Sequence, residues 1–316
     1  MSDYFFYIVL FLISLTLSLL AGKPVIDLLK KSSIKQFIRE EGPQEHKIKK
    51  SSTPTLGGLI FLIPSFFITA IACFLKKEFL TIDLAIVLFV TFIMALAGFV
   101  DDFLKIQKKQ NKGISGWTKL FLQFLLSLLI FYMYKENGNI IYLVWIFFIF
   151  SGACNAYNLT DGLDGLVASV SVLSLVGLSF LLYGLNKPEL LVFCIILSGT
   201  LIGFLYYNKH PAKVFMGDTG SLAIGAGIGT IALVTHSELY LILFSAIPVL
   251  EALSVIIQVS VFKITRWLFK KPKRVFKMTP LHHHFELGGW KETKIVKRFF
   301  IFQAICVVIG IIFLKY

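Results

Sequence analysis

Residues 84–105 read LAIVLFVTFIMALAGFVDDFLK, an apolar run that ends in two adjacent acids, Asp101 and Asp102. The apolar part, residues 84–100, approaches the roughly 20 residues that cross a bilayer as a helix. Acids are costly within a membrane and are usually retained there for a function. This stretch therefore predicts a membrane helix whose end carries chemistry.

The rest of the chain has the composition of a membrane protein. Of its 316 residues, 57% are hydrophobic and only 16% are charged, which is too little charge to cover a soluble protein of this size. We expect one all-α polytopic domain over residues 1–316, in which the first apolar run is retained because it has no basic segment before it and no cleavage site after it. The sequence predicts ten transmembrane helices, over residues 4–22, 56–75, 84–100, 117–134, 140–157, 166–185, 189–206, 221–235, 239–262 and 298–314.

The positions of the basic residues predict the orientation of these helices. Twenty-six of the 31 Lys and Arg residues lie in or beside alternate loops, which end at the same side of the membrane. Because short basic loops stay in the cytoplasm, we expect both termini on the outer side. The net charge of +13 is then a topology signal, helped by attraction to anionic lipid, and it requires no nucleic acid partner.

Asp101 and Asp102 form the first of four polar clusters, all on the predicted cytoplasmic side. A helix C-terminus carries partial negative charge, so two acids there need a compensating cation. Lys105 follows within one helical turn of both acids. The cluster is either a solvated helix end with an ion pair or a site for a metal or phosphate, and we favour the site.

The second cluster is the segment 155–165, NAYNLTDGLDG, between the fifth and sixth spans. Asn155, Asn158 and Asp161 recur every third residue and would share one helical face. Asp161 or Asp164 could instead serve as an N-cap of the next helix. One cap needs one acid, so the wealth of polar groups and glycines favours ligand binding.

The third cluster leads into the eighth span: Asn208 precedes the segment 211–221, PAKVFMGDTGS. A glycine-containing loop before a helix N-terminus is suited to bind an anion, and Asp218 within it indicates that Mg²⁺ bridges protein and phosphate. Phe215 is either loop packing or a platform for a base.

The fourth cluster is the run His282, His283 and His284 in the last long loop. Consecutive side chains on a helix cannot all face one metal, so donors to phosphate or a general acid are better interpretations than a zinc site. A solvated loop is the alternative. Glu251, inside the ninth span, is either a hydrogen-bonded residue of the bundle, which we favour, or part of a substrate groove.

Taken together, the four clusters resemble the signature of the phospho-N-acetylmuramoyl-pentapeptide transferase family, within the polyprenyl-phosphate N-acetylhexosamine-1-phosphate transferase superfamily. The motifs run in the family's order along the whole chain. The resemblance implies a Mg²⁺-dependent enzyme, usually a homodimer, in the bacterial cytoplasmic (inner) membrane with its active site facing the cytoplasm. It would transfer phospho-N-acetylmuramoyl-pentapeptide from UDP-N-acetylmuramoyl-pentapeptide to undecaprenyl phosphate, giving lipid I and UMP for peptidoglycan.

The resemblance also implies roles for individual residues. Asp218 would be the main metal ligand and, with Asp101, Asp102 and the three histidines, would form the catalytic set. The segment 46–56 departs from the family pattern: His46 to Thr53 is one residue longer, Ser52 stands for the family's glycine and Leu56 for its methionine. The residues implied in substrate binding are Lys50, Thr55, Lys105, Asn155, Asn158, Asp161, Gly162, Leu163, Asp164, Asn208 and Phe215.

Two other functions are compatible with parts of this pattern. A sister transferase that uses UDP-N-acetylglucosamine would share the acidic motifs, but the three histidines argue against it. A Mg²⁺ or proton-coupled transporter would also place acids in membrane helices, although near the midplane and not at one face. Glu251 is the residue that would favour a transporter.

Overall fold

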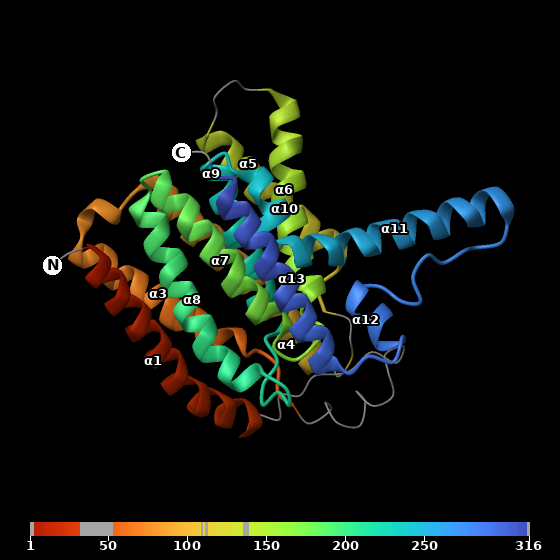
Figure 1. Cartoon of the computed structure of the whole chain (residues 1–316), viewed down its shortest axis with the longest axis horizontal. Helices are drawn as coiled ribbons and strands as arrows, with labels where there is room; N and C mark the ends of the chain where they lie inside the picture. The colour runs from red at the N-terminus through yellow and green to blue at the C-terminus, as the bar shows by residue number, and fades with distance from the viewer. Residues whose placement is uncertain (1–2, 32–52, 109, 111–112, 135–138, 315–316) are drawn as a thin grey trace.

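The computed structural model describes residues 3–31, 53–108, 110, 113–134 and 139–314, and the ordered elements in these ranges are all helical. Ten of the helices described are long and apolar enough to cross a membrane (Figure 1). Their bounds are α1 Asp3–Lys31, α3 Gly58–Leu75, α4 Ile82–Gln107, α5 Gly116–Met133, α6 Ile140–Thr160, α7 Leu166–Gly184, α8 Pro188–Asn208, α9 Gly217–Val234, α11 Ala246–Phe269 and α13 Glu292–Ile312. The short elements are η1 Lys77–Phe79, η2 Glu238–Tyr240, α10 Leu241–Phe244 and α12 Leu281–Glu286.

Helix α9 is the centre of the bundle. All of its residues except Asp218 are buried, and α4, α6, α3 and α7 pack around it. Its glycines allow this crowding: a Cβ atom at Gly225 would lie 2.6 Å from the carbonyl oxygen of Ala153 in α6. Close approach through small residues is how membrane helices gain packing energy, because lipid offers no hydrophobic drive for helices to associate.

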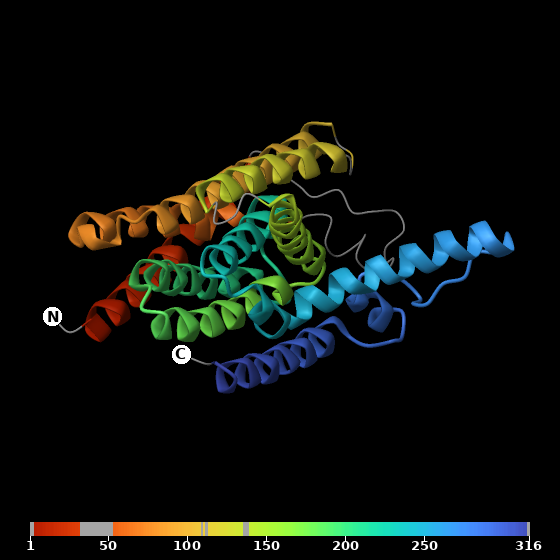
Figure 2. The ribbon, with the colours of Figure 1, turned by 90° about the horizontal axis from the view of Figure 1, so that it is seen from above.

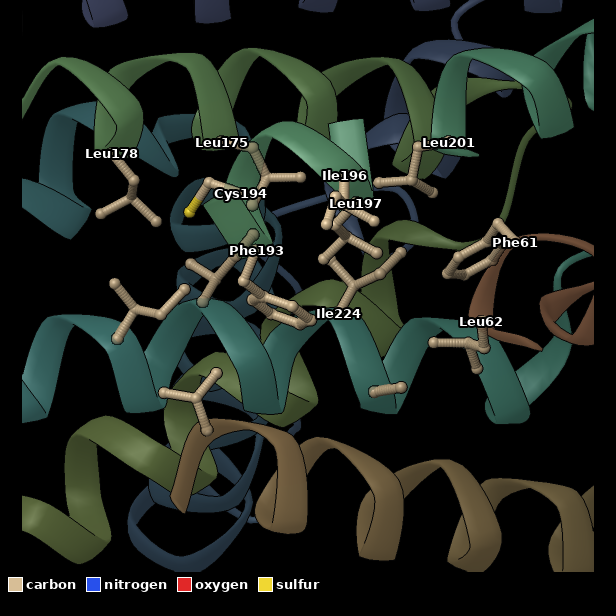
Figure 3. Close-up of a cluster of buried hydrophobic side chains, with 14 of the residues drawn as sticks. Phe61, Leu62, Leu175, Leu178, Phe193, Cys194, Ile196, Leu197, Leu201 and Ile224 are labelled. Atoms are coloured by element: carbon tan, nitrogen blue, oxygen red, sulfur yellow. The ribbon is translucent and has the colours of Figure 1, made fainter. Parts of the chain in front are cut away.

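The apolar core fills the space between α7, α8 and α9. Figure 3 shows Leu175 and Leu178 of α7, Phe193 and Leu197 of α8 and Ile224 of α9 converging in this layer. Large apolar side chains also cover the outside of the bundle, as expected where the surrounding solvent is lipid.

The ten predicted spans correspond to ten long helices, and several of these run past their predicted bounds. Helix α1 continues to Lys31 because Ile26 and Leu29, beyond the predicted end, are buried against the core. Helix α4 continues past the two acids to Gln107, since Lys105 pairs with Asp101 within the same helix and Asp102 accepts hydrogen bonds from the start of α9.

The ninth predicted span, residues 239–262, is not one continuous helix. It is broken at Ser245, where the short α10 ends and α11 begins. Gln303 of α13 satisfies the break: its Oε1 accepts from the Ile247 N–H at 2.9 Å, and its Nε2 donates to the Phe244 carbonyl at 2.6 Å. From this break α11 leaves the bundle and projects far beyond it, as both views show (Figures 1 and 2).

Ion pairs and hydrogen bonds join the ends of the helices that lie opposite the polar clusters. Asp83 at the start of α4 accepts from Lys187 at 2.8 Å and from the Tyr134 hydroxyl. Lys76 pairs with Asp3 at 2.6 Å. This end of the bundle is therefore tied by charges that belong to no candidate site.

Candidate active site

The first turn of α9 is held by acids from two other segments. Asp102 of α4 accepts hydrogen bonds from the Asp218 N–H at 3.2 Å, the Thr219 N–H at 3.0 Å and the Thr219 hydroxyl at 2.8 Å. Asp161 accepts from the Gly217 N–H. The N–H groups of a helix N-terminus have no partner within the helix and carry partial positive charge, so these carboxylates satisfy and stabilise the start of α9.

Asp101 and Asp218 share two lysines. Lys105 lies 2.5 Å from Asp101 Oδ2 and 3.2 Å from Asp218 Oδ2. Lys119, from the first turn of α5, lies 3.0 Å from Asp101 Oδ1 and 2.5 Å from Asp218 Oδ2. Since each ammonium bridges both acids, the pair of cations holds α4, α5 and α9 together at one point.

Asn158 belongs to this centre and Asn155 does not. The Asn158 Nδ2 donates to Asp218 Oδ1 at 3.0 Å and to the Ser221 hydroxyl at 2.9 Å. One turn earlier in α6, Asn155 donates to Gln123 Oε1 at 3.2 Å. Residues three apart on a helix do not lie on quite the same face, and the Asn155 amide therefore points toward α5.

The turn after α6 brings Asp161 and Gly162 to the centre. Partial burial and the nearby carboxylates of Asp218 and Asp102 raise the pKa of the half-buried Asp161. Gly162 is in contact with His282: a Cβ atom at this glycine would lie 2.2 Å from His282 Nε2. The group that Gly162 approaches closely is therefore a histidine of this chain.

Asp164 and Asn208 join the inner loops to one another. Asp164 Oδ2 accepts from the Ala212 N–H at 3.1 Å and lies 3.1 Å from His210 Nδ1, while its own N–H donates to Glu292 at 2.6 Å. Asn208 accepts from the Gly165 N–H at 3.1 Å and donates to the Val214 carbonyl at 3.0 Å. Leu163, in the same turn, is buried in an apolar cluster with α11 and α13 residues.

The segments around Thr55 and Phe215 lie side by side. The Phe215 N–H donates to the Pro54 carbonyl at 2.8 Å, and the Gly57 N–H donates to the Phe215 carbonyl at 2.8 Å. Thr55 is buried beside Gly217, whereas the Phe215 side chain is half-buried. Lys50 lies outside the described residues.

The three histidines of α12 have different surroundings. His282 is buried and hydrogen-bonded to Glu251, while His283 Nδ1 lies 2.7 Å from Glu286 and His284 Nδ1 accepts from the Lys277 N–H at 3.1 Å. His282 lies against Gly162, in the turn that carries Asp161. The structure thus brings His282, one of the three predicted histidines, to this turn.

The acids at the centre can hold a metal. One oxygen from each of Asp101, Asp102 and Asp218 lies within 4.8 Å of the others. Two ammonium groups already lie among these carboxylates, so positive charge is stable at this point. Carboxylate oxygens are the ligands that hard divalent cations prefer.

Three residues of this region, Lys119, His210 and Glu292, were not predicted from the sequence. Lys119 sits at the start of an apolar run, where a lysine is explained equally well by membrane topology. His210 and Glu292 stand in segments that carry no repeated polar pattern, and only the fold brings them to Asp164. The one available signal was Lys119's position at the membrane entry of a span on the same side as the acids.

Acids, lysines and an amide gathered at one end of a bundle of apolar helices define a membrane enzyme that handles charged groups. Comparison with known proteins gives the class: a model of glycosyl transferase family 4 matches residues 84–236. A phospho-N-acetylmuramoyl-pentapeptide-transferase of Prochlorococcus marinus (strain MIT 9215) is 42% identical over 98% of this chain and 90% of its own. The corresponding protein of Clostridium novyi (strain NT) is 43% identical over 95% and 94%. The chain therefore belongs to the phospho-N-acetylmuramoyl-pentapeptide-transferase family.

Proposed function

We propose that the protein transfers phospho-N-acetylmuramoyl-pentapeptide from UDP-N-acetylmuramoyl-pentapeptide to undecaprenyl phosphate, releasing UMP and forming lipid I for peptidoglycan. The family membership carries this proposal. The site supports it, because phosphoryl transfer depends chiefly on positioning and on neutralising charge. The lysines, the amide and the helix N-terminus described above supply groups of that kind.

The chain's own residues would divide the task. Lys105 and Lys119, which lie between Asp101 and Asp218, are placed to attract the phosphates of both substrates. Asp102 fixes the start of α9 and so the position of Asp218. A Mg²⁺ ion held by Asp101, Asp102 and Asp218 would neutralise phosphate charge. The lipid phosphate is already an anion, so the transfer needs no strong base to generate the nucleophile.

The nucleotide would lie on the side of the turn 161–165. Phe215 would stack on uracil, with Thr55, Asn155, Asn158, Asp161, Gly162, Leu163, Asp164 and Asn208 around the donor. Contacts within the protein support an indirect role for two of these residues: Asp164 and Asn208 hold the inner loops in place. Lys50 remains a proposal from the resemblance alone.

Location and assembly are part of the proposal. The basic loops support an active site that faces the cytoplasm from the inner membrane, with both termini outside. We also propose that the protein acts as a homodimer.

UMP release by the purified protein tests the proposed reaction. We expect release from UDP-N-acetylmuramoyl-pentapeptide and undecaprenyl phosphate with Mg²⁺, and none after chelation. Asp218→Asn should lower turnover about 100- to 1,000-fold, because it removes charge from the centre of the site. The control is Asp27→Asn, an exposed acid in α1 that lies in no described contact.

Release from UDP-N-acetylglucosamine instead would identify a sister transferase, and Mg²⁺ flux in liposomes without turnover would identify a transporter.

A further inference from the structure

Glu251 is a completely buried acid in α11, close to the break at Ser245. A carboxyl group in this position is costly, because it is removed from water within a helix of the membrane domain. Its two oxygens lie 3.3 Å from the backbone nitrogen of His282, and Oε1 lies 3.0 Å from His282 Nδ1. One side chain therefore binds both the backbone and the ring of the same histidine.

This contact selects which nitrogen of His282 is available. A carboxylate accepts from Nδ1, so Nδ1 carries a hydrogen whether the ring is neutral or protonated. The other nitrogen, Nε2, is buried and has no hydrogen-bond partner within the described structure. Nε2 is consequently the atom that the ring offers to a ligand.

The free nitrogen faces the turn that borders the metal-binding acids. It lies against Gly162, next to Asp161, whose carboxylate accepts from the Gly217 N–H at the start of α9. No side chain larger than hydrogen fits at Gly162 without moving the ring, because its Cβ atom would lie 2.2 Å from Nε2. The histidine is thus set directly beside the turn where the donor would bind.

Glu251 is also one of the links between α12 and the bundle, beside the packing of Phe285 on Phe299. Helix α11 leaves the bundle and the chain returns through 270–280 before α12 begins, so α12 lies on an extended detour (Figures 1 and 2). Glu251 lies near the start of α11, where that helix is still packed against α6 and α13. It therefore fixes His282 to the rigid part of the molecule.

We propose that Glu251 is a positioning residue for the transfer reaction, holding His282 so that Nε2 contacts a phosphate oxygen of the donor. This inference rests on the proposed function. It separates the three histidines: Glu251 orients His282 toward the donor, whereas His283 Nδ1 lies 2.7 Å from Glu286 and His284 Nδ1 accepts from the Lys277 N–H. Glu251 touches no substrate and acts only through the imidazole.

A double-mutant cycle tests this dependence. Glu251→Gln should lower kcat/KM for the UDP donor about 10- to 100-fold, as removal of an orienting partner of a histidine commonly does. In a His282→Ala background the same change should have less than about a twofold effect, because the group it orients is gone. Glu189→Gln, a buried glutamate at the opposite end of the bundle, is the matched control and should keep the wild-type rate.

Additive losses in the cycle would overturn the proposal, since they would show that Glu251 contributes to folding without acting through His282. A wild-type rate in Glu251→Gln would overturn it as well. If Glu251→Gln does not yield folded protein, nitrogen-15 spectra of histidine-labelled wild-type protein, assigned against His282→Gln, carry the test. A hydrogen on Nδ1 of His282 supports the proposal, and a hydrogen on Nε2 alone refutes it.

The cycle distinguishes this inference from the proposed function. Absence of turnover by the wild-type protein with either donor would refute the proposed function, and the nitrogen-15 spectra would still report the bond between Glu251 and Nδ1. Normal wild-type turnover with an unaffected Glu251→Gln variant would refute the inference alone.

Discussion

Asp101 and Asp102 are neighbours in the sequence but bind different partners. Asp102 accepts from the backbone of Asp218 and from Thr219, which makes it part of the start of α9. Asp101 instead pairs with Lys105 and Lys119. Adjacent residues on a helix point about 100° apart, and this rotation separates a carboxylate that supports the site from one that faces its cations.

A single substitution at Lys119 tests the role of the shared lysines. Lys119→Met keeps an unbranched side chain but removes the ammonium that bridges Asp101 and Asp218, so we expect turnover to fall about 100-fold. Lys105 still pairs with both acids, and the protein should remain folded. The measurement is UMP release, with a thermal melt to confirm folding. Lys108→Met, an exposed lysine at the end of α4, is the control, and an equal loss there would show that general surface charge is responsible.

The sequence was informative about these residues wherever polar groups interrupted an apolar run. Asp101, Asn158 and Asp218 were found because the membrane makes such groups costly, and the structure brings them together. Lys119 was not found, since topology alone explains a lysine at a helix end. The partner of Asp102 could not be read from any spacing, because a contact between α4 and α9 depends on tertiary packing.

At the scale of the elements, the site depends on how closely α4 approaches α9. A Cβ atom at Gly98 would lie 2.2 Å from the Asp218 carbonyl oxygen. The carbonyl oxygen is a backbone atom, which cannot rotate aside as a flexible side chain can. The glycine thus sets the distance between the helix that carries Asp101 and the helix that carries Asp218.

Gly98→Ala should therefore separate the two helices. We expect a loss of stability of about 1–3 kcal/mol, typical of overpacking, together with a marked loss of turnover. Gly152→Ala is the matched control, because a Cβ atom at this glycine of α6 has nothing within 4 Å. There the substitution should be neutral or slightly stabilising, since alanine favours helix more than glycine. Equal melting temperatures and rates for the two variants would contradict the role given to Gly98.

The elements themselves were largely predictable, because length and hydropathy define a membrane helix. The exception is the ninth span, where composition gave one helix and the structure has a break at Ser245. Pro248, near the start of α11, was a local signal, but the groups that satisfy the break come from Gln303 in a distant helix. Sequence spacing cannot show which distant side chain will do this.

At the scale of the molecule, the two ends of the bundle differ in their chemistry. One end carries the acids and lysines of the candidate site together with the turn 161–165 and α12. The other carries structural ion pairs such as Lys76 with Asp3 and Lys187 with Asp83. Because the basic residues concentrate beside the site, charge and chemistry predict the same orientation.

Cysteine labelling tests that orientation for the whole molecule. The four native cysteines are buried, so an introduced cysteine can be labelled against a low background. Lys77→Cys places an exposed thiol in η1, on the predicted outer side of the membrane. Lys271→Cys places one beyond the end of α11, on the predicted cytoplasmic side. A membrane-impermeant maleimide should label the first in intact spheroplasts and the second only after the membrane is opened, since basic loops stay in the cytoplasm. The reverse pattern would place the carboxylates and lysines of the site outside the cell, where a cytoplasmic UDP donor could not reach them, and would contradict the orientation and the proposed reaction together.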